Sequence, residues 1–407
     1  MHTTTQDRWK TRAMLFFISQ SITLFGSTLV QMAIVWYVTR NTSSGAWVAA
    51  FSVCSYLPEF VISFSGGVWA DRYHRKKLII GADFFIAVVT LAMMMRMPYI
   101  SSQSRLLLAL LIMSILRSLG AGIQTPAVNA VVPQLVPADQ LMRFNGINAA
   151  MQSIVRFAAP AAAGVILTIG SLRSTLLIDV LTAVVGIGLL SRISISHERK
   201  ERGAPVSADL KAGLSYAFSD KLIRRLLMVY GLFVFLCVPA GYLAGLFVSR
   251  VYGESYGYLT MVELAGFAGM MVGGLLMGTW GGFKSRKATL LLGLAIFGMM
   301  AILMGMSANF TFYLALMAVY GVALTTVQTA ITTLLQEKTE VAMQGRVFGL
   351  LGSMYSGCMP VGMMVFGPLA DAVPLRWIMI ASGIALIVLA MVLRCDRQFW
   401  SATRAQN

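Results

Sequence analysis

The sequence has little charge and little of what catalytic sites use. Only 12% of its 407 residues are charged, against about a quarter in soluble domains, which excludes an ordinary soluble protein. Its three histidines, His2, His74 and His197, lack metal-ligand spacing. The phosphate-binding pattern G-x-x-x-x-G-K-[ST] is absent, and no nucleophile lies in a recognisable catalytic context. The sequence therefore predicts no enzyme, no metal and no cofactor.

Cysteines are few, and their spacing excludes two further classes. The sequence has four, without paired spacing and all in or beside apolar segments: Cys54, Cys237, Cys358 and Cys395. Neither a disulfide framework nor a zinc site is indicated. Acidic residues are also scarce, which leaves a net charge of +16. The cations flank apolar runs, so membrane topology explains the excess and no nucleic-acid partner is expected.

Long apolar runs are what the sequence has in abundance. Hydrophobic residues make up 57% of the chain, and about 20 apolar residues suffice to cross a bilayer. The pattern predicts an all-α integral membrane protein with twelve spans, at 13–38, 46–67, 78–97, 105–126, 146–169, 173–192, 222–249, 257–280, 288–306, 309–335, 347–370 and 374–393. The first run is too long for the core of a signal peptide, so we expect it to remain as an anchor.

The distribution of Lys and Arg predicts the orientation. Most of the 32 cations fall in segments on the same side as the N-terminus, which places both termini in the cytoplasm. A long polar connection at about 193–221 separates six spans from six. We therefore predict an N-terminal half at 1–195, a cytoplasmic linker at 196–221 and a C-terminal half at 222–407 with a short cytoplasmic tail.

A short basic segment recurs in the two halves. Residues 66–77, with Gly67, Asp71, Arg72, Arg75 and Lys76, are predicted to form a tight cytoplasmic turn between two spans. Residues 278–287 repeat the Gly-x-Trp and the trailing Arg-Lys, with Gly282 in place of the acid. Repeated six-span halves are typical of transporters that work by alternating access around a central site.

These motifs resemble those of a known family over nearly the whole chain. Residues 67–77 resemble the loop signature of the major facilitator superfamily, G-x-x-x-D-R-x-x-R-[KR], and residues 117–120 resemble its fourth-span arginine motif. Within that superfamily, residues 31–34, 80–83, 125–131 and 135–141 are similar to Mef-type macrolide efflux pumps. The resemblance implies the twelve-helix facilitator fold and a proton-coupled drug antiporter of the bacterial inner membrane.

Ionisable residues inside apolar spans are candidates for coupling and gating, because burying a charge in a bilayer is costly. The sequence offers Glu59, Asp83, Arg117, Arg156, Asp179 and Glu263. We expect Asp83 to pair with the basic loop in one gate conformation. Arg117 acts in coupling or gating, or forms a structural ion pair. Asp179, about two turns from the outer end of the sixth span, is a further coupling candidate, with contact to outside water as the alternative.

Two of these acids occupy matching places in the two halves. Glu59 and Glu263 lie in the second and eighth spans, and a carboxyl group in a low-dielectric site is suited to reversible protonation. Each could instead merely line the cavity. Glu59, which follows Pro58, is the preferred coupling residue, and we expect it to pair with Arg117 in a closed state.

Polar and aromatic positions suggest where a ligand is held. Gln20, Ser27 and Gln31 share one stripe of the first span, which faces the cavity or hydrogen-bonds to another helix. Further cavity candidates, suited to a bulky apolar ligand, are Tyr230, Phe233, Gln328 and Tyr355. The runs 269–273 and 274–278, each glycine-x-x-x-glycine, are interpreted as close-packing motifs.

We therefore expect an exporter of bulky, amphipathic antibiotics in exchange for protons, with macrolides as the leading class on resemblance alone. Other hydrophobic cargo, such as a siderophore or a lysolipid, is one alternative, and a transport-dead membrane sensor is another. The partners expected are the drug and the lipid bilayer, for a functional monomer. A separate ATP-binding partner protein is left open.

Overall fold

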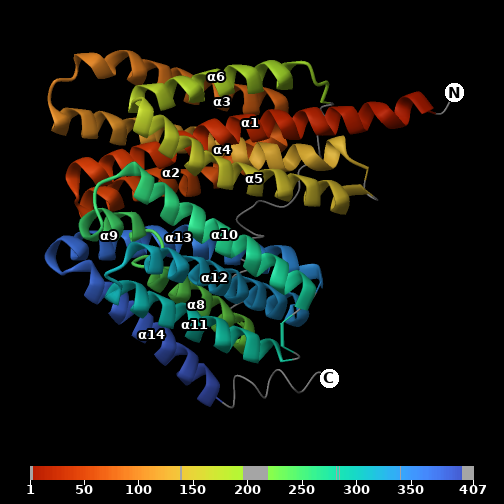
Figure 1. Cartoon of the computed structure of the whole chain (residues 1–407). Helices are drawn as coiled ribbons and strands as arrows, with labels where there is room; N and C mark the ends of the chain where they lie inside the picture. The colour runs from red at the N-terminus through yellow and green to blue at the C-terminus, as the bar shows by residue number, and fades with distance from the viewer. Residues whose placement is uncertain are drawn as a thin grey trace. The chain divides into compact units, whose positions relative to one another are not determined.

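The computed structural model describes residues 3–137, 140–195, 219–280, 282–283, 285–339 and 341–396. These residues form helices and short connections (Figure 1). The helices are α1 (Thr3–Thr42), α2 (Gly45–Arg72), α3 (Arg75–Arg96), η1 (Met97–Tyr99), α4 (Gln103–Leu135), α5 (Leu141–Ile169), α6 (Leu172–Ser191), α8 (Lys221–Cys237), α9 (Ala244–Val251), α10 (Tyr256–Trp280), α11 (Arg286–Met306), α12 (Phe310–Lys338), α13 (Val341–Ala372) and α14 (Leu375–Cys395).

Eleven helices of the described residues are long and apolar enough to cross a membrane. The seventh predicted span, 222–249, is not one helix but two, because α8 ends at Cys237 and α9 begins at Ala244. Pro239 lies in the intervening turns and cannot donate a backbone hydrogen bond. With α8 and α9 counted as one interrupted span, the helices match the twelve predicted.

The chain divides into two compact units. The first contains Met1–Val38 and Phe51–Gly203, and the second contains Thr39–Ala50 and Ala204–Asn407. The end of α1 and the first residues of α2 therefore belong to the second unit. Most of the predicted linker, 196–218, lies outside the described residues, so its cytoplasmic position stays a prediction.

Polar side chains mark the starts of several helices. Ser171 caps α6 by accepting a hydrogen bond from the Ser174 amide, and Asp220 caps α8 by accepting from two amides of its first turn. Asn309 does the same for α12 through the Phe312 amide. Such caps satisfy amide donors that have no partner inside the helix. They therefore help to fix the residue at which each of these helices begins.

Glycines let α10 and α12 of the second unit pack closely. A Cβ atom on Gly273 would lie 2.9 Å from the Val322 Cα, and one on Gly269 would overlap the Ala318 backbone. The interpretation of residues 269–273 as a packing motif is therefore confirmed. The same interpretation was wrong for Gly274 and Gly278, because a Cβ atom there would meet nothing within 4 Å.

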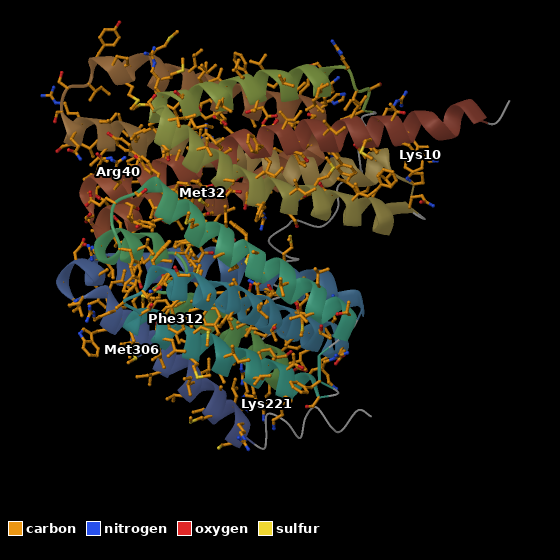
Figure 2. All side chains as sticks on the ribbon, in the orientation of Figure 1. Lys10, Met32, Arg40, Lys221, Met306 and Phe312 are labelled. Carbon is orange, nitrogen blue, oxygen red and sulfur yellow. The ribbon has the colours of Figure 1, made fainter. Side chains whose placement is uncertain are left out.

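Many large apolar side chains are exposed on the helices. Met306, the last residue of α11, and Phe312, in the first turn of α12, are examples labelled in Figure 2. Exposed apolar surface on this scale is unfavourable in water and favourable in lipid. The exposed side chains therefore agree with a chain whose helices are surrounded by hydrocarbon.

Candidate functional site

A buried ion pair lies inside the first unit. Arg117 of α4 donates to Asp179 of α6, and it also donates to the hydroxyl group of Thr90 on α3. The Thr90 hydroxyl lies 3.1 Å from the same Asp179 carboxylate. Asp179 is only 2% exposed, because α1 approaches it closely at Gly26. The alternative that Asp179 meets outside water was therefore wrong.

The same pair corrects the expected partner of Arg117. We expected Glu59 to neutralise this cation, but the guanidinium group binds Asp179 instead. Glu59 lies on α2, where its carboxylate is 3.5 Å from the Thr125 hydroxyl. Whether Arg117 acts in coupling stays a prediction.

A second buried carboxyl lies on the same face of α3, seven residues before Thr90. Asp83 is 1% exposed, and its Oδ1 atom accepts a hydrogen bond of 2.5 Å from the Gln124 amide. The other carboxyl oxygen, Oδ2, is buried and has no hydrogen-bond partner among the described residues. Asp83 was expected to bind the basic loop, but the structure places it against α4.

The basic loop is shorter than predicted, because α2 continues to Arg72 and α3 begins at Arg75. Arg75 donates to the carbonyl oxygens of Ala70 (2.9 Å) and Ala130 (2.7 Å). These bonds join α2 and α4 to the start of α3. The side chain of Asp71 lies outside the described residues, so its predicted docking stays a prediction. A Cβ atom on Gly67 would meet nothing within 4 Å, whereas one on Gly66 would overlap Gly122.

Lys76 extends this clamp to the end of α6. Its ammonium group donates to the carbonyl oxygens of Ser191 and Ile193, each at 2.8 Å. Carbonyl oxygens at a helix C-terminus have no partner within the helix and carry partial negative charge. Arg75 and Lys76 therefore join α2, α4 and α6 to the start of α3. Arg72, at the end of α2, is exposed.

Next to the ion pair lies a cavity of about 350 Å³, also inside the first unit. It is bordered by α1, α2, α4 and α5, and its polar lining includes Gln20, Ser27, Gln31, Glu59, Arg117, Gln124, Asn148, Gln152 and Arg156. The stripe predicted on α1 thus lies on the wall. Its role in binding stays a prediction.

An inserted hydroxyl group interrupts the backbone hydrogen bonding of α2 at the cavity wall. The Glu59 amide donates to Ser118 Oγ at 2.8 Å, and Ser118 in turn donates to the Ser55 carbonyl at 2.8 Å. Ser118 therefore stands between two groups that bond directly in a regular helix. Side-chain insertion and a proline are both recognised causes of helix bending, and Pro58 precedes Glu59.

The candidates in the second unit are less well placed. Phe233 is fully buried, with its ring centroid 4.9 Å from that of Phe297, and Tyr230 is also buried. Both side chains are packed in the interior around α8, so their place on a cavity wall stays a prediction. Tyr355 is exposed and shares a hydrogen bond with the hydroxyl of Tyr242. Glu263 and Gln328 are half-buried.

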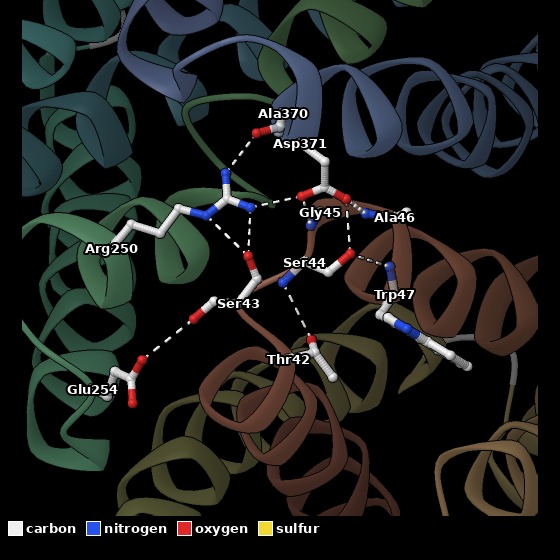
Figure 3. A network of polar contacts seen from close by, with 10 residues as sticks. All are labelled: Thr42, Ser43, Ser44, Gly45, Ala46, Trp47, Arg250, Glu254, Ala370 and Asp371. Carbon is white, nitrogen blue, oxygen red and sulfur yellow. Dashed lines mark hydrogen bonds and ion pairs between the residues drawn. The ribbon is translucent and has the colours of Figure 1, made fainter. Parts of the chain in front are cut away.

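A polar network in the second unit fixes the start of α2 (Figure 3). Asp371, near the end of α13, accepts from the amides of Gly45 (2.7 Å) and Ala46 (2.9 Å) and from the Ser44 hydroxyl. Arg250 of α9 donates to the same carboxylate at 2.6 Å. Asp371 thus acts as an external cap for α2.

Several functional candidates escaped the sequence analysis. Thr90, Gln124 and Ser118 are uncharged and looked ordinary, although Thr90 and Gln124 lie seven residues after Asp83 and Arg117 and so on the same helix faces. Asp371 and Arg250 fell at span ends. No cluster of three His, Cys, Asp or Glu that could hold a metal occurs in the part of the chain that the structure describes.

Comparison with known proteins shows the family of the chain. The sequence profile of the Major Facilitator Superfamily matches residues 16–363. Macrolide efflux protein A of Streptococcus pyogenes is 29% identical over 396 residues, 95% of this chain and 96% of that protein. The Enterococcus faecalis protein of the same name is 30% identical over 328 residues, 78% of this chain and 99% of that protein.

Solved structures of transporters share the fold. A nucleoside transporter matches with a TM-score of 0.74 at 12% identity, covering 95% of this chain and 99% of that one. A bacterial homologue of the human lysosomal transporter Spinster, inward-facing and unoccupied, matches with a TM-score of 0.72 at 14% identity, covering 97% of each chain. At such identities the likeness concerns the fold alone.

Proposed function

Because the chain belongs to the major facilitator superfamily of membrane transporters, we propose that it exports bulky, amphipathic antibiotics in exchange for protons. Macrolides are the leading substrate class, supported by the shared name of two relatives that each match more than three quarters of the chain. The proton gradient is the proposed energy source, with no cofactor. The protein works as a monomer in the bilayer of the bacterial inner membrane, with both termini in the cytoplasm.

The observation that carries the proposal is the polar cavity of the first unit. Its volume of about 350 Å³ falls within the roughly 300 to 1,000 Å³ of sites for drug-sized ligands. Amide side chains on its wall can orient a ligand rich in oxygen atoms. The Glu59 carboxylate offers a counter-charge to a basic amine, the group that would make such an antibiotic cationic.

A drug-susceptibility panel in a pump-deficient bacterium tests the proposed function. Cells that express the chain should tolerate severalfold more macrolide than cells with an empty vector. The matched control is Arg117→Ala at equal expression, which leaves Asp179 without its cation and should lose the resistance. Unchanged susceptibility to every macrolide, with the protein present in the membrane, would remove this substrate class.

Transport by membrane vesicles tests the energy source and the alternatives together. Radiolabelled erythromycin should accumulate in inverted vesicles when a proton gradient is imposed and should leak out when the gradient is collapsed. Labelled siderophore and lysolipid are measured in parallel, because their transport without erythromycin transport would favour the alternative cargo. Transport that required ATP despite the gradient would instead indicate a separate ATP-binding partner protein.

A further inference from the structure

We propose that Asp83 holds a proton in this conformation, and that its release is linked through Gln124 to occupation of the cavity. This inference rests on the proposed proton-driven export. It names Asp83, which the sequence suggested for gating, as the residue that carries the proton. A negative charge on Asp83 would be unfavourable, because the side chain is almost wholly buried in a membrane-spanning helix.

Among the residues that the structure describes, no cation is paired with Asp83. It lies on α3, which packs against α4 and α6. The charged side chain that α4 brings to this cluster is Arg117, and α6 brings Asp179, which acts on Asp83 as a like charge. Because Arg117 is already paired with Asp179, ionised Asp83 would leave one uncompensated negative charge in the cluster. A proton on Asp83 makes the cluster neutral.

The hydrogen bonds lead to the same assignment. An ionised carboxylate has room for about four donors on its two oxygens. Asp83 has the Gln124 amide at Oδ1, while Oδ2 is buried without a partner in the described part of the chain. Leaving a charged oxygen bare in an apolar interior is far more costly than leaving a neutral hydroxyl group there. The environment is therefore built for the protonated acid.

Gln124 connects this acid to the cavity. Its side chain lines the cavity while its amide group donates to Asp83. A ligand that donates a hydrogen bond to the Gln124 amide oxygen would polarise that amide and strengthen its donation to Asp83, which favours the ionised carboxylate. Glu59 and Arg156 are the other ionisable side chains on the cavity wall besides Arg117, and the Glu59 carboxylate contacts Thr125 instead of Asp83.

Proton release then requires the cluster to rearrange. The O–H bond of Asp83 breaks, the proton passes to water, and the carboxylate that remains must find a cation. Arg117, seven residues before Gln124 on α4, is the cation of the cluster, so it would have to be shared between Asp83 and Asp179. The protonation state is thereby tied to the packing of α3, α4 and α6.

The first test needs no substrate. Asp83→Asn keeps the shape and stays neutral, so purified protein should fold and melt at least as well as the wild type. If the folded wild type holds a proton that the unfolded chain releases, its melting temperature falls as the pH rises, and Asp83→Asn should lose much of that fall. The control Ser171→Ala, which removes a helix cap without an ionisable group at the start of α6, should keep the wild-type slope. An unchanged slope in Asp83→Asn, or failure of this variant to fold, would overturn the proposal.

The second test measures coupling. Erythromycin is added to purified protein in weak buffer, and proton release and drug binding are recorded for the wild type, Asp83→Asn, Glu59→Gln and Glu263→Gln. Asp83→Asn should bind drug and lose proton release, while Glu263→Gln should release protons as the wild type does. Glu59→Gln lacks the proposed counter-charge, so it should bind drug more weakly but release as many protons per drug molecule bound. The proposal is wrong if Asp83→Asn still releases protons while Glu59→Gln or Glu263→Gln does not. Coupling would then belong to the glutamate whose substitution abolished proton release. Should the wild type bind no drug, the proposed function fails while the melting test still decides whether Asp83 holds a proton.

Discussion

The ion pair of Arg117 and Asp179 shows how strongly one residue depends on another inside the first unit. Both side chains are removed from water, and Thr90 provides a further polar partner. Separating two buried charges leaves one without compensation, whereas removing both does not. The pair therefore contributes little net stability while it is intact, and the loss of either partner alone is costly.

Substitution of a single partner should be more harmful than substitution of both. Asp179→Asn alone should lower the free energy of unfolding by about 3 to 5 kcal/mol, as expected for an uncompensated buried charge. The double variant Arg117→Gln with Asp179→Asn should recover a large part of that loss. Thermal melting in detergent measures both, and additive losses would show that the two charges do not stabilise each other.

The backbone hydrogen bonding of α2 near Glu59 also depends on one side chain. Ser118 joins the Glu59 amide to the Ser55 carbonyl, so Ser118→Ala leaves two backbone groups unsatisfied or lets them close into a regular turn. We expect a loss of about 1 to 3 kcal/mol in stability and weaker drug binding, because Glu59 is displaced. Thr168→Ala is the control, since among the contacts described its hydroxyl bonds to Gly164 of its own helix and it is not on the cavity wall. Equal drug affinity in the two variants would contradict a role for the inserted hydroxyl group.

At the scale of helices, hydropathy predicted the spans well and their ends less well. The charged residues of 71–77 suggested a loop, yet α2 runs on to Arg72 because cations at a helix C-terminus are favourable. The interruption between α8 and α9 was missed because its residues are as apolar as their neighbours, although Pro239 and Gly241 were visible. The partner of Arg117, Asp179, lies on another helix. Residue spacing along one sequence does not tell which helices pack together, so this pair could not be predicted.

Close packing of α10 and α12 predicts a contrast between two glycines of one helix. Gly269→Leu would drive a side chain into the Ala318 backbone and should cost at least about 1 to 3 kcal/mol. Gly274→Leu has open space around its Cβ atom and should change stability by less than about 0.5 kcal/mol. Melting temperatures of the two purified variants give the comparison. Similar losses would mean that helix propensity, rather than packing, limits both positions.

The cap that Asp371 places on α2 is testable in the same way. Asp371→Ala removes the acceptor of two amides and of Arg250, and a loss of about 1 to 3 kcal/mol is expected because the site is partly exposed. Glu254→Ala is the control, since its carboxylate makes a single long contact of 3.4 Å with Ser43. If the control lost as much stability as Asp371→Ala, the network would not act as a cap.

For the whole molecule, the distribution of cations predicts the orientation in the membrane. Tyr73 lies between α2 and α3 and is 59% exposed, and Tyr99 ends η1 and is 87% exposed. In a variant without native cysteines, Tyr99→Cys should react with a membrane-impermeant maleimide from outside the cell. Tyr73→Cys should react only after the membrane is permeabilised. The reverse result would invert the proposed topology.

The pairing of Arg117 with Asp179 also has a consequence for biogenesis. The two residues are 62 positions apart, so at about 5 to 20 residues per second the ribosome needs about 3 to 12 s to supply the anion after the cation. During that interval α4 carries an arginine whose membrane insertion costs about 2.5 to 3.5 kcal/mol at the helix centre. A nascent chain stopped before α6 should therefore hold α4 at the translocon, and α6 should release it into the lipid.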